Sequence, residues 1–254
     1  MFLLLLSLIL FFLFYVFYLF FWDEGSLEGS IEGFEGSNVQ ILSKDSVLDL
    51  LVYNPPDNYY DSFSDLDLKA RNVKSLDEYL RKIRSVCFYS DADKNKIIRR
   101  CITRASKEDK GKWIDMDKLR ALPWKIAVTS GGSTYEYGFP HTRGDVIVVN
   151  EKDVKDDDEF VDTLLHEQMH VYQKMYPEDF QKYLDSEGFV RYCRRNLMPN
   201  VAANPDADAW VYMKDGEVFV GQYASIGQYD KKNKIVYKPM NHPRFDCPQE
   251  YSIY

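Results

Sequence analysis

The sequence predicts an α+β fold, in which N-terminal helices precede a small mixed sheet and a long central helix. Apolar residues recur at helical spacing in several stretches of the chain. Two short apolar runs, 124–129 and 145–150, instead have the composition of strands. Asp215-Gly216 lies between two further apolar runs, which is a strong β-hairpin signal.

The first 22 residues are almost wholly apolar. As a helix they would span about 33 Å, enough for a hydrocarbon core of about 30 Å. A cleaved signal peptide would show a basic start and small residues at a cleavage site, so residues 1–22 are interpreted as an uncleaved transmembrane signal-anchor. We expect a single-pass membrane protein whose large domain is extracytoplasmic or lumenal, although no glycosylation sequon supports a lumenal domain.

Residues 23–39, rich in Gly, Ser and Glu, predict a flexible acidic linker, with the folded domain over residues 40–254. The net charge of −8 argues against nucleic acid as a partner. Four cysteines allow three pairings, and a lumenal domain would favour disulfides. In the alternative interpretation, Cys87 and Cys101 are reduced core residues, because both fall on apolar helical positions.

The first half of the domain is predicted to be helical. Ser75 and Glu78 form a capping box before a helix that extends to about residue 86, and a second helix carries the apolar positions of 97–105. Strands follow at 124–129 and 145–150, with a turn at 130–133.

A long helix is predicted over about 157–175, preceded by the acidic run 151–159. Carboxylates gather where the helix dipole favours them, and the spacing matches no calcium loop. Pro177 begins another helix that Gly188 ends, and strands are expected at 210–213, 218–223 and 234–237. Pro248 is expected to be the first residue of a final helix with Glu250 in its first turn.

The most informative pattern is His166-Glu167-Gln168-Met169-His170, an H-E-x-x-H motif inside the long helix. Histidines at this spacing lie on one helical face, so both rings can bind one metal ion. The glutamate between them is placed to accept a proton from a water beside that ion. The competing interpretation is an exposed helix with no metal, but burying Glu167 unpaired on a mostly apolar helix would be costly.

The motif resembles that of the zincin metallopeptidases, and among them the gluzincins, in which a downstream glutamate completes the metal site. The longer metzincin motif does not fit, because Gln173 and Tyr176 stand where it needs glycine and histidine. The resemblance covers the motif helix and the third ligand. It implies a sheet packed on that helix and an edge strand that pairs with an extended substrate, for which 145–150 is the natural candidate.

Four residues are candidates for the third ligand: Glu250, Glu187, Asp206 and Asp208. Glu250 ranks first, because its place at the start of a new helix resembles that of the gluzincin glutamate. The Pro-x-Glu run at 248–250 also resembles membrane-anchored peptidases, some of them from large DNA viruses, which would place the chain in a virion or host membrane. Asp206 and Asp208 are more typical of a turn.

These observations together predict a membrane-anchored zinc metalloendopeptidase. His166, His170 and Glu250 would bind Zn²⁺, and Glu167 would be the general base that hydrolyses a peptide or protein substrate. Residues 1–22 would contact the lipid bilayer. The alternative is a catalytically inactive zincin scaffold that acts in binding or structure, which a chain ending four residues after Glu250 would favour.

Overall fold

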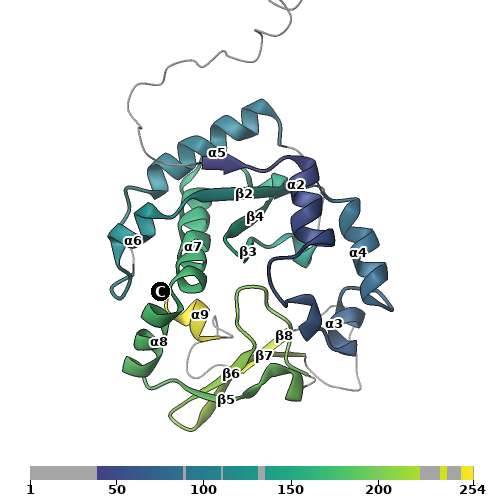
Figure 1. Ribbon diagram of the computed structural model, residues 1–254, viewed down its shortest axis with the longest axis vertical. Coiled ribbons are helices and arrows are strands. Elements are labelled where there is room, and N and C mark those ends of the chain that lie inside the picture. The colour runs from purple at the N-terminus through teal and green to yellow at the C-terminus, as the bar shows by residue number, and fades with distance from the viewer. Residues whose placement is uncertain are drawn as a thin grey trace, which may run out of the picture. The chain divides into compact units, whose positions relative to one another are not determined.

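A computed structural model describes residues 39–253, apart from 88–89, 110, 131–134, 199, 224–234 and 239–246. The described residues form helices and two separate sheets, which confirms the predicted α+β class (Figure 1). The predicted signal-anchor, the linker up to residue 38 and the predicted turn at 131–133 lie outside the described residues. Within the described part of the chain, no helix is long and apolar enough to cross a membrane.

The first sheet has the strand order β1-β2-β4-β3. β1 (Val39–Ile41), β2 (Trp124–Thr129) and β4 (Val146–Asn150) run parallel, and β3 (His141–Arg143) is antiparallel to β4. The two strands predicted at 124–129 and 145–150 are therefore confirmed. They lie at the centre of this sheet.

The prediction that 145–150 forms the edge strand is wrong. β4 lies between β2 and β3, and β3 is at the edge. The physical reason is visible in the sequence of β4, whose side chains alternate between two cores: Ile147 and Val149 enter one, and Val146 and Val148 enter the other. A strand covered on both faces is apolar throughout, which is typical of an interior strand.

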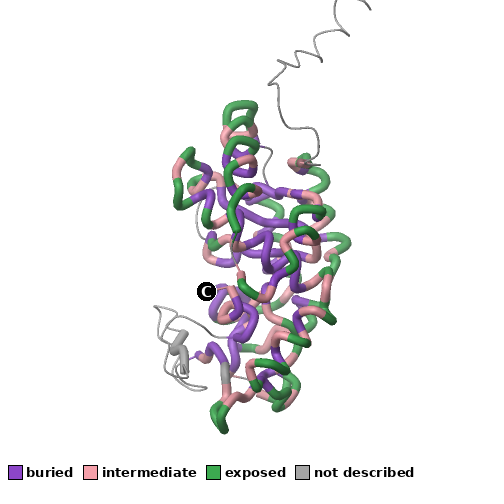
Figure 2. Tube along the Cα trace, turned by 90° about the vertical axis from the view of Figure 1, so that its left-hand side faces the viewer, coloured by how far each residue is buried: buried purple, intermediate pink, exposed green. Residues whose placement is uncertain are grey.

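Helices cover both faces of this sheet (Figure 1). On one side pack α5 (Ala92–Ala105), α6 (Met116–Ala121) and the motif helix α7 (Asp158–Met175). On the other side pack α2 (Lys44–Leu48) and α4 (Leu76–Arg84). Figure 2 shows the buried residues on the inner side of the trace and exposed residues on the outer turns.

Side-chain caps fix where several helices begin. Ser75 accepts a hydrogen bond from the Glu78 amide at the start of α4, but the Glu78 carboxylate accepts from Lys74, so the predicted capping box is half formed. A complete capping box, Ser64 with Asp67, begins α3 (Asp65–Ala70). Asp157, which belongs to the acidic run, caps α7 by accepting a hydrogen bond from the Phe160 amide.

The second sheet is antiparallel, with β5 (Val190–Arg194), β6 (Trp210–Lys214), β7 (Glu217–Tyr223) and β8 (Ile235–Lys238) in sequence order. Asp215 and Gly216 have φ values of 53° and 82°, which are those of the tight turn that the Asp-Gly pair predicts. α8 (Pro177–Ser186) precedes this sheet and ends before Gly188, which has a φ of 77°. Single helical turns occupy the connections Asp49–Tyr53, Tyr60–Ser62, Glu136–Gly138, Glu151–Asp153 and Arg195–Leu197.

The last helix, α9 (Pro248–Tyr251), begins at the predicted proline. It is short but packed: the Trp113 indole N–H donates to the Ser252 carbonyl at 2.8 Å, and Tyr251 meets Phe189 edge to face. The four cysteines, all of them described, form no disulfide with one another, and Cys87 and Cys101 are buried as core residues. α9 lies beside the middle of α7, where the motif is.

Candidate metal centre

The motif helix is held in place by its apolar face. Leu164, Met169 and Tyr172 are fully buried in the core shared with α5 and the sheet. The opposite side of α7 carries His166, Glu167 and His170. A rigid, well-packed helix therefore fixes the spacing of the motif side chains.

The two motif histidines and Glu250 converge on one point. Nε2 of His166 and Nε2 of His170 lie 3.1 Å apart. The Glu250 carboxylate faces both, with Oε2 at 3.2 Å from His166 Nε2 and Oε1 at 3.3 Å from His170 Nε2. The structure thus brings together the residues that the sequence singled out as metal ligands.

Gln173, one turn after His170, sets the orientation of the His170 ring. The Gln173 amide nitrogen donates to the Gln249 carbonyl at 3.0 Å and to the Ser252 hydroxyl at 2.8 Å. Its carbonyl oxygen must therefore face His170 Nδ1, which lies 2.9 Å away. Since Nδ1–H donates to that oxygen, the lone pair of a neutral ring is on Nε2, facing His166 and Glu250.

This donor set fits zinc. Ligand atoms bound tetrahedrally at about 2.0–2.1 Å lie about 3.3 Å from one another, close to the separations among these three side chains. Two imidazole nitrogens and a carboxylate are also the ligand types that zinc takes in a catalytic site, where three protein ligands leave a position open. His166 is 20% exposed and His170 fully buried, so the site opens to solvent on the His166 side.

Electrostatics within the cluster favour a positive charge at this point. Burial lowers the pKa of His170, but the facing carboxylates of Glu250 and Asp206 outweigh it and raise that pKa to about 10. Burial raises the pKa of Glu250, but the charge of His170 and hydrogen bonds from both histidines bring it well below its usual range. A cation bound here would take the place of the proton, because metal ligands bind in their deprotonated forms.

The other candidates for the third ligand have different partners. Glu187 accepts from Lys214 Nζ at 3.0 Å, and Asp208 accepts from the Tyr212 hydroxyl at 2.6 Å and the Trp210 amide. Asp208 therefore forms the turn that the sequence favoured for it. Asp206 lies near His170 and Glu167. These three residues form a second group whose possible metal-ligand atoms lie close together.

Glu167 is the buried carboxylate of the site. It is 4% exposed, and its Oε2 has no hydrogen-bond partner among the residues that the structure describes. Burial raises the pKa of Glu167 well above its usual value, and the nearby Asp206 raises it further. A desolvated carboxylate beside a metal position is a stronger base than one in water, as a general base requires.

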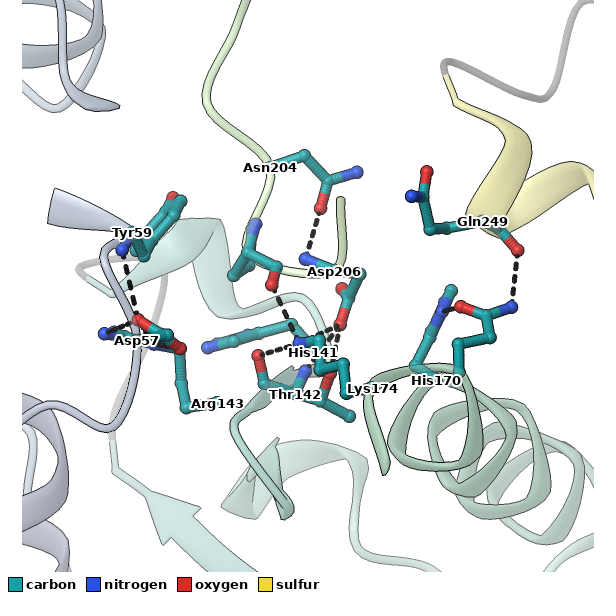
Figure 3. A network of polar contacts seen from close by, with 12 residues as sticks. Asp57, Tyr59, His141, Thr142, Arg143, His170, Lys174, Asn204, Asp206 and Gln249 are labelled. Carbon is teal, nitrogen blue, oxygen red and sulfur yellow. Dashed lines mark hydrogen bonds and ion pairs between the residues drawn. The ribbon is translucent and has the colours of Figure 1, made fainter. Parts of the chain in front are cut away.

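Asp206, which lies close to Glu167, belongs to a second polar cluster. This cluster joins three distant segments (Figure 3). Asp206 Oδ1 accepts from the amide of Thr142 at 2.7 Å and from its hydroxyl at 2.6 Å. Lys174 Nζ donates to the Thr142 carbonyl at 3.1 Å and to the Pro205 carbonyl at 2.9 Å. Both backbone groups of Thr142, the middle residue of β3, are thus occupied by side chains.

A cleft of about 1570 Å³ opens over His166 and Glu167. Its lining comes mainly from α7, from residues 109 and 111–113, from the end of α8 and from residues 251–253. Trp113 and Tyr183 contribute stacked rings to one wall, with centroids 4.8 Å apart. A cleft of this size is larger than most small-molecule pockets.

Sequence reasoning missed several residues that shape the site. Gln173 entered only as a mismatch to another motif, although its place three residues after His170 puts both on one face. Thr142 and Lys174 carried no sequence signal. His141 is buried, with its Nδ1 2.9 Å from the Phe139 carbonyl.

The chain matches no protein-family model, no curated protein and no solved structure.

Proposed function

We propose that this protein is a zinc-dependent metallopeptidase of the gluzincin type. The observation that supports it is the convergence of His166, His170 and Glu250 within 3.3 Å of one another, beside the buried carboxylate of Glu167. The H-E-x-x-H helix packed on a mixed sheet, and a glutamate from a later helix, resemble the arrangement of that family.

In this proposal His166, His170 and Glu250 hold the zinc ion. When bound, zinc would act as a Lewis acid and lower the pKa of a water molecule to about 7. Gln173 keeps the His170 ring in the tautomer that offers Nε2. Hydrogen bonds from Gln173 to Gln249 and Ser252 keep α9, and with it Glu250, against α7.

Glu167 acts as the general base and then as the general acid. It accepts a proton from the water that attacks the peptide carbonyl, and it delivers that proton to the leaving amine. Because its Oε2 has no partner among the described side chains, that oxygen is available for the water. The substrate is a peptide or protein segment that enters the cleft from the His166 side.

The proposal includes a membrane anchor in residues 1–22, whose composition suits a bilayer span. The catalytic domain would then act on substrates near one membrane surface, outside the cytosol. The position of α9 favours an active enzyme over an inert scaffold. This helix is bonded to Gln173 on α7 and holds Glu250 against the two histidines.

The test uses the full-length protein in detergent micelles. Zinc content is measured after dialysis for wild type and His166→Ala, and cleavage of a broad pool of peptides is measured for wild type and Glu167→Gln. We expect one zinc per chain in wild type, loss of zinc in His166→Ala, and retained zinc with cleavage reduced by about 10²–10⁴-fold in Glu167→Gln.

Glu187→Gln is the matched control, since Glu187 lines the same cleft but pairs with Lys214. It should retain zinc and most of the activity. A wild-type protein that binds no zinc would refute the metal site. A zinc-loaded protein that cleaves no peptide would refute the peptidase activity.

A further inference from the structure

β5 is an edge strand whose outer side is open. It lies at the border of the second sheet and pairs with β6 (Figure 1). Within the described part of the chain, residues 190–194 make no backbone hydrogen bond outside that pairing. In an antiparallel strand, every second residue directs its N–H and C=O away from the neighbouring strand. β5 therefore presents backbone groups with which an extended peptide can pair.

The side chains of this strand carry positive charge that no described carboxylate neutralises. Arg191 and Arg194 are both exposed, and both guanidinium groups lie over the Trp210 ring, at 5.2 and 4.1 Å from its centre. A guanidinium packed over an aromatic face still has N–H groups for a carboxylate. Arg195 is buried, and its Nε and Nη1 have no hydrogen-bond partner among the described residues, so its charge adds to the local positive potential.

The two exposed arginines lie on one face of the sheet. Arg191 pairs with Tyr212 and Arg194 with Trp210, and these two positions of β6 share a face because they are two residues apart. A bulge between Arg191 and Cys193 brings the arginines to that face although they are three residues apart. Carboxylates on one face of an added strand would therefore meet both.

Protection of the edge does not account for all of this surface. Charged side chains and a bulge protect many edge strands from other chains. β5, however, also exposes Val190 and Tyr192, which are 51% and 55% accessible and would strengthen the binding of another strand. A second copy of this chain is a poor partner, because pairing through β5 would bring the arginines of the two copies together.

We infer that β5 is a docking site for an extended, acidic segment of another protein, which adds to the second sheet as a strand. The backbone of this segment would pair with β5, and its carboxylates would bind Arg191 and Arg194. In a chain of net charge −8, a basic strand of this kind favours an acidic partner. No residue of β5 is among the described residues that line the cleft over His166, so the inference does not rest on the proposed function.

The test measures the binding of synthetic strands. Full-length Glu167→Gln protein in micelles, chosen so that no peptide is cleaved, is titrated with fluorescent eight-residue peptides. These alternate valine with glutamate, with lysine or with serine. We expect the glutamate peptide to bind at least about tenfold more tightly than the lysine peptide at low salt, with the difference shrinking as salt is raised. A glutamate peptide that is N-methylated at every residue should bind at least about threefold more weakly, because it has no N–H groups to donate.

Charge reversal then localises the site. In the same background, adding Arg191→Glu and Arg194→Glu should weaken binding of the glutamate peptide at least about tenfold, with the urea midpoint unchanged. Arg81→Glu with Arg84→Glu is the matched control, because these are also exposed arginines three residues apart, on α4. This control should leave the affinity as it was.

Three results would overturn the inference. The first is equal affinity for the three peptides, or tight binding that survives the reversal on β5. The second is binding that N-methylation leaves unchanged, since charge alone would then hold the peptide. The third is binding to vesicles of anionic phospholipid that requires Arg191 and Arg194 in a protein that binds no peptide, since the surface would then face a membrane.

Discussion

His170 and Gln173 are joined by a hydrogen bond of 2.9 Å between Nδ1 and Oε1, one helical turn apart on α7. The same amide holds Gln249 and Ser252 through its nitrogen. One side chain therefore links a candidate metal ligand to the helix that carries Glu250. The orientation of the His170 ring and the position of Glu250 depend on each other through Gln173.

Replacing Gln173 with alanine should weaken zinc binding by about 10–100-fold, because outer partners of metal ligands contribute this much. The ring of His170 would lose its fixed tautomer, and α9 would lose two hydrogen bonds to α7. Competition with a chromophoric chelator measures the affinity. Gln181→Ala is the matched control, because it removes a glutamine side chain on α8, away from the metal centre. It should leave the zinc affinity unchanged. Unchanged affinity in Gln173→Ala would show that Gln173 does not support the metal site.

Glu250→Gln distinguishes the candidates for the third ligand. Its amide would keep the shape of the side chain but remove the negative charge that faces both histidines. We expect bound zinc to fall below one ion per chain after dialysis, whereas Glu187→Gln and Asp208→Asn should stay fully loaded. Atomic absorption on the three variants gives the answer. Full loading of Glu250→Gln together with loss in either of the others would reassign the ligand.

Asp206→Ala should destabilise the domain by about 1–3 kcal/mol, the usual range for leaving buried polar groups unpaired. The amide and hydroxyl of Thr142 would both lose their acceptor, and Lys174 would lose the carboxylate that lies 3.8 Å away. Urea unfolding followed by tryptophan fluorescence measures the change. Asp185→Ala, at an exposed position on α8, should stay within about 0.5 kcal/mol of wild type. A loss that small in Asp206→Ala would mean that the Thr142 cluster adds little to stability.

Acid should destabilise the domain partly through Asp57. Burial raises the pKa of this carboxyl, but hydrogen bonds and charge from Arg143 outweigh burial and hold it below its usual value. The stabilisation that the Asp57 carboxylate contributes is complete above the pKa of about 3.9 that an aspartate has in the unfolded chain. It is lost as the pH falls through the lower pKa of Asp57 in the folded protein.

Asp57→Asn tests this, because an amide does not titrate there. Its urea midpoint should lie below that of wild type at pH 6, and the gap should narrow between about pH 4 and pH 2.5. Asp77→Asn, at an exposed position without a described link to Arg143, provides the comparison. A gap that stays constant down to pH 2.5 would exclude Asp57 as a source of the acid sensitivity.

Much of this arrangement could be predicted from the sequence, because local patterns determine it. Each of these features is visible within a few residues: the apolar period of α7, the acidic run at its start, the Asp-Gly hairpin and Pro248 as the start of α9. The pairing of Glu250 with the motif histidines was expected from the resemblance to the gluzincins, in which a downstream glutamate completes the metal site.

The parts that were missed depend on contacts between distant segments. β3 carries no apolar alternation, because its buried residues are His141, Thr142 and Arg143. Thr142 and Arg143 are bonded to Asp206 and Asp57, which lie far away in the sequence. The wrong prediction of an edge strand at 145–150 has the same cause. Because the sequence does not predict β3, β4 would be the last strand of its sheet. Gln173 reaches a carbonyl 76 residues away, and no local pattern marks such a contact.

The occupied backbone of Thr142 has a consequence for how molecules of this protein meet one another. An open strand at the border of a sheet is a template on which a second chain can add, the common first step towards fibrils and swapped dimers. Here that border is three residues long, and the carboxylate of Asp206 and the ammonium of Lys174 hold the N–H and C=O of its middle residue. Local detachment of the 204–206 segment would uncover this border while the rest of the fold stayed intact. Self-association should therefore follow the opening of that short segment, ahead of global unfolding.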